Sequence, residues 1–168
     1  MLSFPTPSVM IAVSRYYADV ADHLMAGATA ALDAENVRYE VIDAPGAFEL
    51  PAAVRIAVRS MDFFTGRQRF DGFIALGCVI RGETSHYDLV CSETARGLQS
   101  LALEHTLALG FGVVTCENRE QALHRARPDG KDVGGHAARA CSRFSQVTTP
   151  KPSASVCSSA RLCSPRAV

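Results

Sequence analysis

The chain of 168 residues lacks tryptophan and has no excess of either charge. Its 17 lysines and arginines are balanced by 17 aspartates and glutamates. A neutral chain without a run of basic residues does not offer the positive surface that nucleic-acid binding requires. We therefore expect no nucleic-acid partner. The same balance leaves little charge repulsion to oppose self-association.

Long apolar segments are also missing. The longest apolar runs are far shorter than the roughly 20 residues that a membrane-spanning helix needs. Residues 1–8 contain no lysine or arginine ahead of the first apolar run. We therefore expect no signal peptide, no membrane partner and a cytoplasmic location.

The six cysteines do not have the spacing of a metal site. There is no C-x-x-C pair and no cluster of cysteine with histidine, so we expect no zinc and no other metal. Cys78 and Cys116 lie in apolar runs, where a free cysteine acts as a small apolar side chain. Reduced thiols of this kind agree with a cytoplasmic protein.

Short apolar runs alternate with segments of helical periodicity. The predicted strands are residues 9–13, 37–42, 73–80 and 112–116. The predicted helices are residues 17–34, 50–61, 87–109, 118–126 and 134 to about 143. Gly110 is expected to close the third helix. Strands that alternate with helices predict an α/β fold with a parallel sheet and helices on both faces.

Ligands of such folds bind at the carboxyl ends of the strands. We therefore expect functional residues in the loops that follow the predicted strands. These loops are residues 14–17, 44–49, 81–86 and 117–118. Two of these loops also carry helix-start signals. Ser85 with Asp88 predicts a capping box, and Asn118 predicts a helix N-cap.

The composition changes at Ser142. Residues 142–168 contain seven serines and three prolines and show no sustained helical period. We predict one domain at residues 1–141, followed by a divergent, poorly ordered tail at residues 142–168.

Residues 77–88 combine a strand, a polar turn with glycine and the start of a helix. Free N–H groups at a helix N-terminus bind anions. A phosphate can lie against the backbone of Glu83 and Thr84 and against the hydroxyls of Thr84 and Ser85. His86 stands beside them, and imidazole can move protons near neutral pH. These residues alone also allow a simpler interpretation, in which Ser85 only caps the helix and His86 is a surface residue.

These segments resemble a known family, the lumazine synthases. Residues 77–88 read GCVIRGETSHYD, similar to the family's G-x-V-I-R-G-x-T-x-H-x-D motif. Residues 45–51 read PGAFELP, similar to its P-G-A-F-E-hydrophobic-P segment. Residues 114–126 resemble its fourth strand and the helix that follows. The matches occur in the family's order and spacing over roughly residues 9–141, which makes them highly specific together.

The resemblance implies a flavodoxin-like three-layer fold with a central parallel four-stranded sheet. It also implies a transferase of riboflavin biosynthesis. The family condenses 5-amino-6-(D-ribitylamino)uracil with 3,4-dihydroxy-2-butanone 4-phosphate to give 6,7-dimethyl-8-ribityllumazine, inorganic phosphate and water. It uses neither a metal nor an organic cofactor, so we expect no cofactor here.

The resemblance further implies roles for individual residues. His86 is implied as the general acid–base catalyst. Phosphate contacts are implied for Thr84, for the backbone N–H of Glu83, and for Arg125, whose guanidinium can engage two oxygens. The residues implied to hold the pyrimidine and the ribityl chain are Tyr16, Ala47, Phe48, Glu49, Cys78, Val79, Ile80 and Phe111.

Active sites of this family lie between adjacent subunits of a pentamer. The resemblance therefore implies a homopentamer or a larger homo-oligomer, with Arg125 and Phe111 entering the site of a neighbouring subunit. The chain departs from the family at Val133, where a lysine is common, although Lys131 lies two residues earlier. It departs again after Cys141, where the family's last helix usually continues as an apolar segment.

Other interpretations stay open. The same pocket can hold a flavin or a ribityl compound without turnover, or the chain can be an assembly-defective variant with an altered C-terminus. A flavodoxin-like redox carrier fits less well, because no phosphate loop rich in glycine and hydroxyls follows the first strand. At single positions, Tyr16 and Phe111 can be packing residues, and Glu49 a carboxylate at a helix start.

Overall fold

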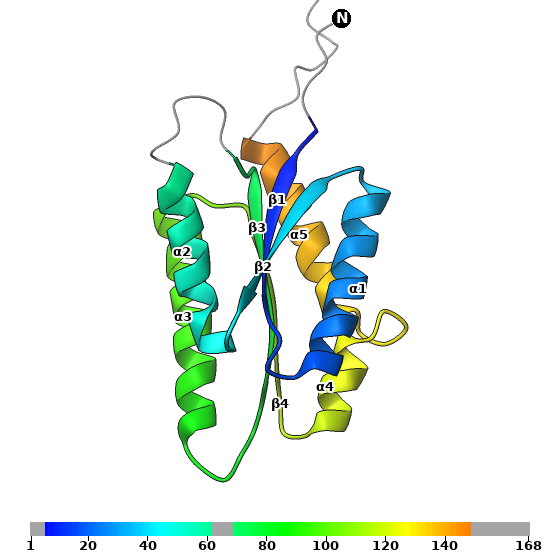
Figure 1. Cartoon of the computed structure of the whole chain (residues 1–168), viewed down its shortest axis with the longest axis vertical. Helices are drawn as coiled ribbons and strands as arrows, with labels where there is room; N and C mark the ends of the chain where they lie inside the picture. The colour runs from blue at the N-terminus through cyan, green and yellow to red at the C-terminus, as the bar shows by residue number, and fades with distance from the viewer. Residues whose placement is uncertain (1–5, 62–68, 149–168) are drawn as a thin grey trace, which may run out of the picture.

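The computed structural model describes residues 6–61 and 69–148 (Figure 1). The strands are β1 (Ser8–Ser14), β2 (Arg38–Ala44), β3 (Gly72–Ile80) and β4 (Leu109–Cys116). The helices are α1 (Ala18–Ala34), the 3₁₀ helix η1 (Ala47–Glu49), α2 (Leu50–Met61), α3 (His86–Glu104), α4 (Arg119–Ala126) and α5 (Val133–Thr148).

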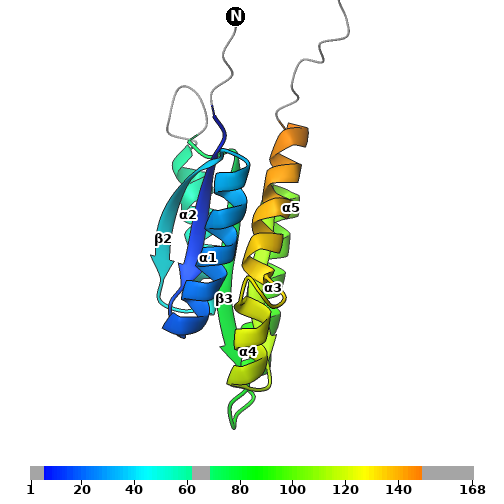
Figure 2. The ribbon, with the colours of Figure 1, turned by 90° about the vertical axis from the view of Figure 1, so that its right-hand side faces the viewer.

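The strands form one parallel sheet in the order β2-β1-β3-β4. Helices α2 and α3 cover one face, and α1, α4 and α5 cover the other (Figure 1 and Figure 2). This arrangement confirms the predicted three-layer, flavodoxin-like α/β fold with four parallel strands. Within the described residues, no helix is both long and apolar enough to cross a membrane.

The apolar runs of the sequence are explained by burial on both faces of the sheet. In β1, Val9, Ile11 and Val13 pack toward α1, α4 and α5. Met10 and Ala12 point to the opposite side, toward α2 and α3. Because side chains alternate along a strand, a strand covered on both faces must be apolar throughout.

The third helix ends earlier than predicted. Helix α3 stops at Glu104, and Thr106 follows with a positive φ of 52°, while the Leu107 N–H donates to the Ala102 carbonyl. Gly110 is therefore no helix cap but part of β4. A Cβ at Gly110 would lie 2.1 Å from the Ala137 carbonyl oxygen, so this glycine allows α5 to approach the sheet closely.

The last described helix continues past Ser142, the residue at which the sequence predicted that a poorly ordered tail begins. Helix α5 continues to Thr148, with Ser142 and Ser145 buried. Their hydroxyls have partners, because Ser142 donates to the Glu35 carboxylate and Ser145 to the Ser142 carbonyl at 2.8 Å. The rest of the expected tail, 149–168, lies outside the described residues, so the division of the chain into two parts stays a prediction.

The capping predictions have different outcomes. The Asn118 side chain accepts a hydrogen bond from the Gln121 N–H at 3.0 Å, which confirms the N-cap of α4. Ser85 precedes α3 but makes no side-chain capping bond. The predicted capping box does not form, because the Asp88 carboxylate pairs with the Arg81 guanidinium instead.

Candidate active site

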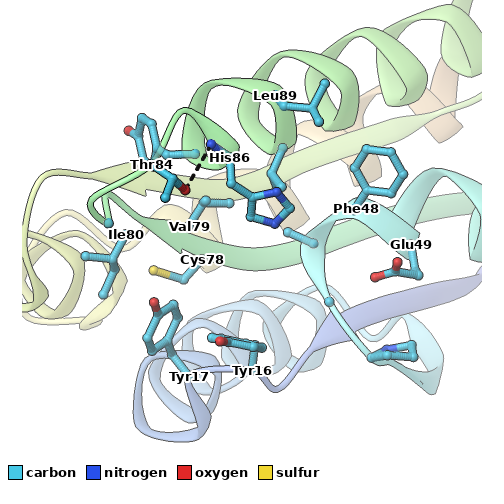
Figure 3. Close-up of a pocket in the computed structure, with 16 residues that line it drawn as sticks. Tyr16, Tyr17, Phe48, Glu49, Cys78, Val79, Ile80, Thr84, His86 and Leu89 are labelled. Carbon is cyan, nitrogen blue, oxygen red and sulfur yellow. Dashed lines mark hydrogen bonds between the residues drawn. The ribbon is translucent and has the colours of Figure 1, made fainter.

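A pocket of about 580 Å³ lies at the carboxyl ends of β1, β2 and β3 (Figure 3). The loops that follow these strands form its walls, as the α/β topology predicts. Its lining residues are Tyr16, Tyr17, Pro45, Gly46, Ala47, Phe48, Glu49, Cys78, Val79, Ile80, Gly82, Thr84, His86, Tyr87, Leu89 and Val90.

Two adjacent tyrosines after β1 form one side of the opening. Their rings meet edge to face, with centroids 5.0 Å apart. Tyr16 is 73% exposed, so it is no core aromatic, whereas Tyr17 is half-buried. An exposed aromatic ring at a pocket mouth offers a flat face on which a heterocycle can stack.

The segment between β2 and α2 forms a second side. Phe48 is 49% exposed, and Glu49 presents its carboxylate at the same rim (Figure 3). A Cβ at Gly46 would lie 2.8 Å from a Glu49 carboxylate oxygen, so the glycine leaves room for this side chain. The Ala47 carbonyl accepts a buried hydrogen bond from Thr94 of α3 at 3.2 Å, which anchors η1.

The end of β3 forms the floor, with Cys78, Val79 and Ile80. The Cys78 side chain faces the α1 side of the sheet and also reaches the pocket. Burial, helped by the nearby Cys116 thiol, raises the pKa of Cys78 to about 12. At neutral pH the thiol is therefore a neutral wall group and not a nucleophile.

The loop between β3 and α3 brings Gly82, Thr84 and His86 to the pocket. The His86 backbone N–H donates to the Thr84 hydroxyl at 3.4 Å (Figure 3). Figure 3 shows the His86 imidazole directed from the start of α3 toward Phe48, with the tyrosines on the far side of the floor. The ring thus lines the open pocket, where it can exchange a proton with a bound molecule.

Among the described residues that line the pocket there is no lysine or arginine, and Glu49 is the one carboxylate. Arginines that follow the strand ends nearby are engaged elsewhere: Arg15 pairs with Asp22 and Asp43. Similarly, Arg119 pairs with Asp19 at 2.8 Å. A phosphate bound here therefore meets N–H groups and hydroxyls but no cation from the lining residues.

Three residues predicted for the site lie outside the pocket lining: Glu83, Phe111 and Arg125. Glu83 is exposed in the β3–α3 loop. Phe111 is 46% exposed on β4, an edge strand of the sheet. Arg125 is exposed on α4 and contacts the Cys116 thiol.

The loop at residues 117–118 was expected at the site, but it does not line the pocket. Glu117 instead pairs with Arg81, and Asn118 caps α4. The Ser85 hydroxyl, considered beside Thr84 for a phosphate, does not line the pocket either. The other residues that the resemblance implies for the site do line it: Tyr16, Ala47, Phe48, Glu49, Cys78, Val79, Ile80, Thr84 and His86.

Several lining residues escaped the sequence prediction. Tyr17 and Tyr87 directly follow the predicted residues Tyr16 and His86, and Leu89 lies three residues after His86, so proximity in the chain was the signal available for them. Within residues 6–61 and 69–148, no group of three or more His, Cys, Asp or Glu residues is placed to hold a metal ion.

Three known proteins with similar sequences all belong to one enzyme family. A family model described as 6,7-dimethyl-8-ribityllumazine synthase matches residues 6–149, and so extends past Ser142. The 6,7-dimethyl-8-ribityllumazine synthase 1 of Rhizobium meliloti (strain 1021) is 49% identical over 132 residues, covering 79% of this chain and 85% of that protein. The 6,7-dimethyl-8-ribityllumazine synthase of Paramagnetospirillum magneticum (strain ATCC 700264 / AMB-1) is 45% identical over 139 residues, covering 83% and 93%. That of Agrobacterium fabrum (strain C58 / ATCC 33970) is 47% identical over 134 residues, covering 80% and 89%.

Proposed function

Because the chain belongs to the 6,7-dimethyl-8-ribityllumazine synthase family and is a transferase of riboflavin biosynthesis, we propose that the pocket after β1, β2 and β3 is its active site. There it condenses 5-amino-6-(D-ribitylamino)uracil with 3,4-dihydroxy-2-butanone 4-phosphate. The observation that carries the assignment is that two of the matching motifs, residues 45–51 and 77–88, lie far apart in sequence and contribute to the lining of one pocket.

The pyrimidine lies against Tyr16 and the floor formed by Cys78, Val79 and Ile80. Stacking requires a flat face and no particular charge, which an exposed tyrosine ring supplies. The ribityl chain extends along Phe48 and Glu49, whose carboxylate accepts hydrogen bonds from sugar hydroxyls. A neutral Cys78 thiol fits this binding role.

His86 transfers protons during the condensation. The 5-amino group attacks the ketone, water leaves, and an imine forms. Elimination of inorganic phosphate and closure of the second ring, with loss of another water, then give 6,7-dimethyl-8-ribityllumazine. Each of these steps moves a proton to or from nitrogen, oxygen or carbon, and an imidazole in the cavity can serve as both acid and base.

The phosphate group lies at the β3–α3 loop, against the Thr84 hydroxyl and the N–H groups that open α3. The lining residues supply no cation there. A dianion in a partly apolar pocket needs a charged partner, and arginine is the side chain best matched to phosphate. Arg125 is exposed outside the pocket, so we propose that it completes the site of a neighbouring subunit.

This arrangement requires a homo-oligomer, and we propose a homopentamer or a larger assembly in the cytoplasm. Phe111, exposed on edge strand β4, accompanies Arg125 into the neighbouring site. An isolated chain would then hold every catalytic group and no complete site.

The proposal is tested by assaying full-length protein with both substrates while its mass is measured by light scattering. We expect lumazine and stoichiometric phosphate from a species of at least five chains. Tight flavin binding without product would instead favour a binding protein. An inactive monomer would indicate an assembly-defective variant.

A further inference from the structure

Arg81 is the first residue after β3, and it spans the loop that carries the predicted phosphate and acid–base groups. Its backbone N–H donates to the Cys116 carbonyl at 2.9 Å, which extends the pairing of β3 with β4 by one bond. The backbone of Arg81, where the loop begins, is therefore held at the carboxyl edge of the sheet.

The guanidinium makes contacts along its edge and through its face. The Arg81 Nε lies 2.9 Å from a carboxylate oxygen of Glu117, and an Nη lies 3.1 Å from a carboxylate oxygen of Asp88. The central carbon lies 4.0 Å from the centroid of the Tyr87 ring. Only a planar cation with several donors can pair with two carboxylates and stack on a ring at once.

These partners lie on both sides of the loop. Arg81 precedes residues 82–86, whereas Tyr87 and Asp88 follow them in the first turn of α3. The side chain thus closes residues 82–86 into a ring, and Glu117 ties that ring to the end of β4. Thr84 and His86 lie inside the closed segment and line the pocket.

Among the described contacts, the other restraints on residues 82–86 are backbone bonds of the first helical turn to the Ser85 carbonyl and one bond to the Thr84 hydroxyl. Gly82, Thr84 and His86 are exposed, and a Cβ at Gly82 would meet nothing within 4 Å. The bond from the His86 N–H to the Thr84 hydroxyl is long, at 3.4 Å. The position of the imidazole therefore depends strongly on how the two ends of the loop are joined.

We propose that Arg81 is a positioning residue, which holds His86 and Thr84 in their working geometry through its contacts with Tyr87, Asp88 and Glu117. Arg81 does not line the pocket, and both of its ionic partners lie on this chain. It acts on the reaction through the loop and not by touching substrate. The inference rests on the proposed roles of His86 and Thr84.

A role in positioning differs from a role in global stability. The side chains of Arg81, Asp88 and Glu117 are 39%, 62% and 59% exposed. Exposed ion pairs contribute little to the free energy of unfolding. A displacement of a catalytic group by about 1 Å, in contrast, can cost roughly 100-fold in rate.

The test compares Arg81→Met with Arg69→Met. Arg69 makes a similar set of contacts, an ion pair with Glu40 and a cation–π contact with Phe70 at 5.0 Å, but it precedes β3 at the other end of that strand. We expect Arg81→Met to lower kcat about tenfold or more, with the KM for the ribityl substrate within about twofold. Arg69→Met should leave both unchanged, and both variants should keep a similar melting temperature.

A double-mutant cycle separates positioning from an independent effect. In a His86→Gln background, Arg81→Met should lower kcat by less than about twofold, because the proton-transferring group that it positions is gone and the remaining Thr84 is proposed to bind phosphate, not to transfer protons. A full tenfold loss in that background would overturn the proposal, as would an unchanged kcat in the single variant.

A second measurement needs no catalysis. The Asp88 and Leu89 amides both donate to the Ser85 carbonyl, at 3.1 and 3.3 Å. Hydrogen exchange at these amides should be at least about tenfold faster in Arg81→Met, and unchanged in Arg69→Met. If His86→Gln kept full turnover, the proposed acid–base role would fail, and this exchange rate would then decide the positioning role alone.

Discussion

Gly134 of α5 lies so close to Leu24 of α1 that a Cβ on the glycine would come within 2.0 Å of the Leu24 carbonyl oxygen. The backbones of the two helices therefore meet directly at this point, and Leu24 itself is fully buried. On the sheet side of α5, Gly110 allows an equally close approach to Ala137. Helix α5 is therefore fixed between α1 and β4 by positions that tolerate no side chain.

This close contact predicts that Gly134→Ala destabilises the fold. The new methyl group meets backbone and not a flexible side chain, so α5 must shift away from α1. We expect a loss of about 1–3 kcal/mol in the free energy of unfolding, measured by urea denaturation. Gly82→Ala is the matched control, because a Cβ there meets nothing within 4 Å. Equal stabilities of the two variants would contradict the packing described here.

The proposed acid–base role predicts the kinetics of His86→Gln. Glutamine keeps a polar side chain of similar size but cannot transfer a proton as imidazole does. We expect kcat to fall by about 100-fold or more, with KM values for both substrates within about threefold. Steady-state assays of lumazine formation measure both parameters. His136→Ala, on the exposed side of α5, should match the wild type; a His86→Gln variant that also matched it would rule out the role.

The proposed phosphate role predicts a selective defect in Arg125→Ala. Loss of a charge-assisted contact should raise the KM for the phosphorylated ketone about tenfold or more, while the KM for the ribityl substrate changes little. Arg127→Ala, which removes an exposed arginine two residues further on, is the control. Equal effects on both substrates, or an equal effect of the control, would assign the phosphate contact elsewhere.

Buried thiols predict a loss of stability in alkali. Burial raises the pKa of Cys141 from an ordinary 9.0 to about 12 in the folded protein, and its thiol donates to the Ala108 carbonyl at 3.3 Å. Between these values the unfolded chain loses the proton and the folded chain keeps it, so stability falls as pH rises. Each such thiol contributes a slope of at most about 1.4 kcal/mol per pH unit.

Urea denaturation between pH 8 and pH 11 measures this slope. Cys141→Ala should be less stable than the wild type at pH 8, because it loses a buried side chain, yet its stability should fall less steeply with pH. Parallel slopes for the two proteins would show that Cys141 does not carry the predicted shift.

The sequence predicted the sheet well, because strands buried on both faces are continuous apolar runs. The run at residues 73–80 became β3 almost unchanged, at Gly72–Ile80. The predicted end of the third helix was wrong, because Gly110 was interpreted as a signal that stops a helix. Its actual partner is Ala137, far away in the chain, and a contact of that kind leaves no local pattern.

For the candidate site, too, local sequence patterns were predictive and contacts between distant parts of the chain were not. Residues carried by motifs, such as Glu49 and His86, were predicted to lie together and do line one pocket. Arg81 lies in the same motif and in a loop where functional residues were expected, but no role of its own was predicted for it from the sequence. Its contact with Glu117 depends on how β3 and β4 end side by side, so its place in the loop emerges from the tertiary structure.

Subunit mixing tests the central claim, that each active site is shared between two copies of the chain. His86→Gln and Arg125→Ala proteins are unfolded together, refolded at equal ratio and assayed, with each variant refolded alone as the control. If His86 and Arg125 act from different subunits, random assembly restores about a quarter of the sites. We predict that the mixture regains about that fraction of the wild-type rate at a concentration of the phosphorylated ketone well below its KM, where the defect of Arg125→Ala lowers the rate. A mixture that is no more active than the average of the two variants, although light scattering shows mixed oligomers, would place the whole site within one chain and contradict the account.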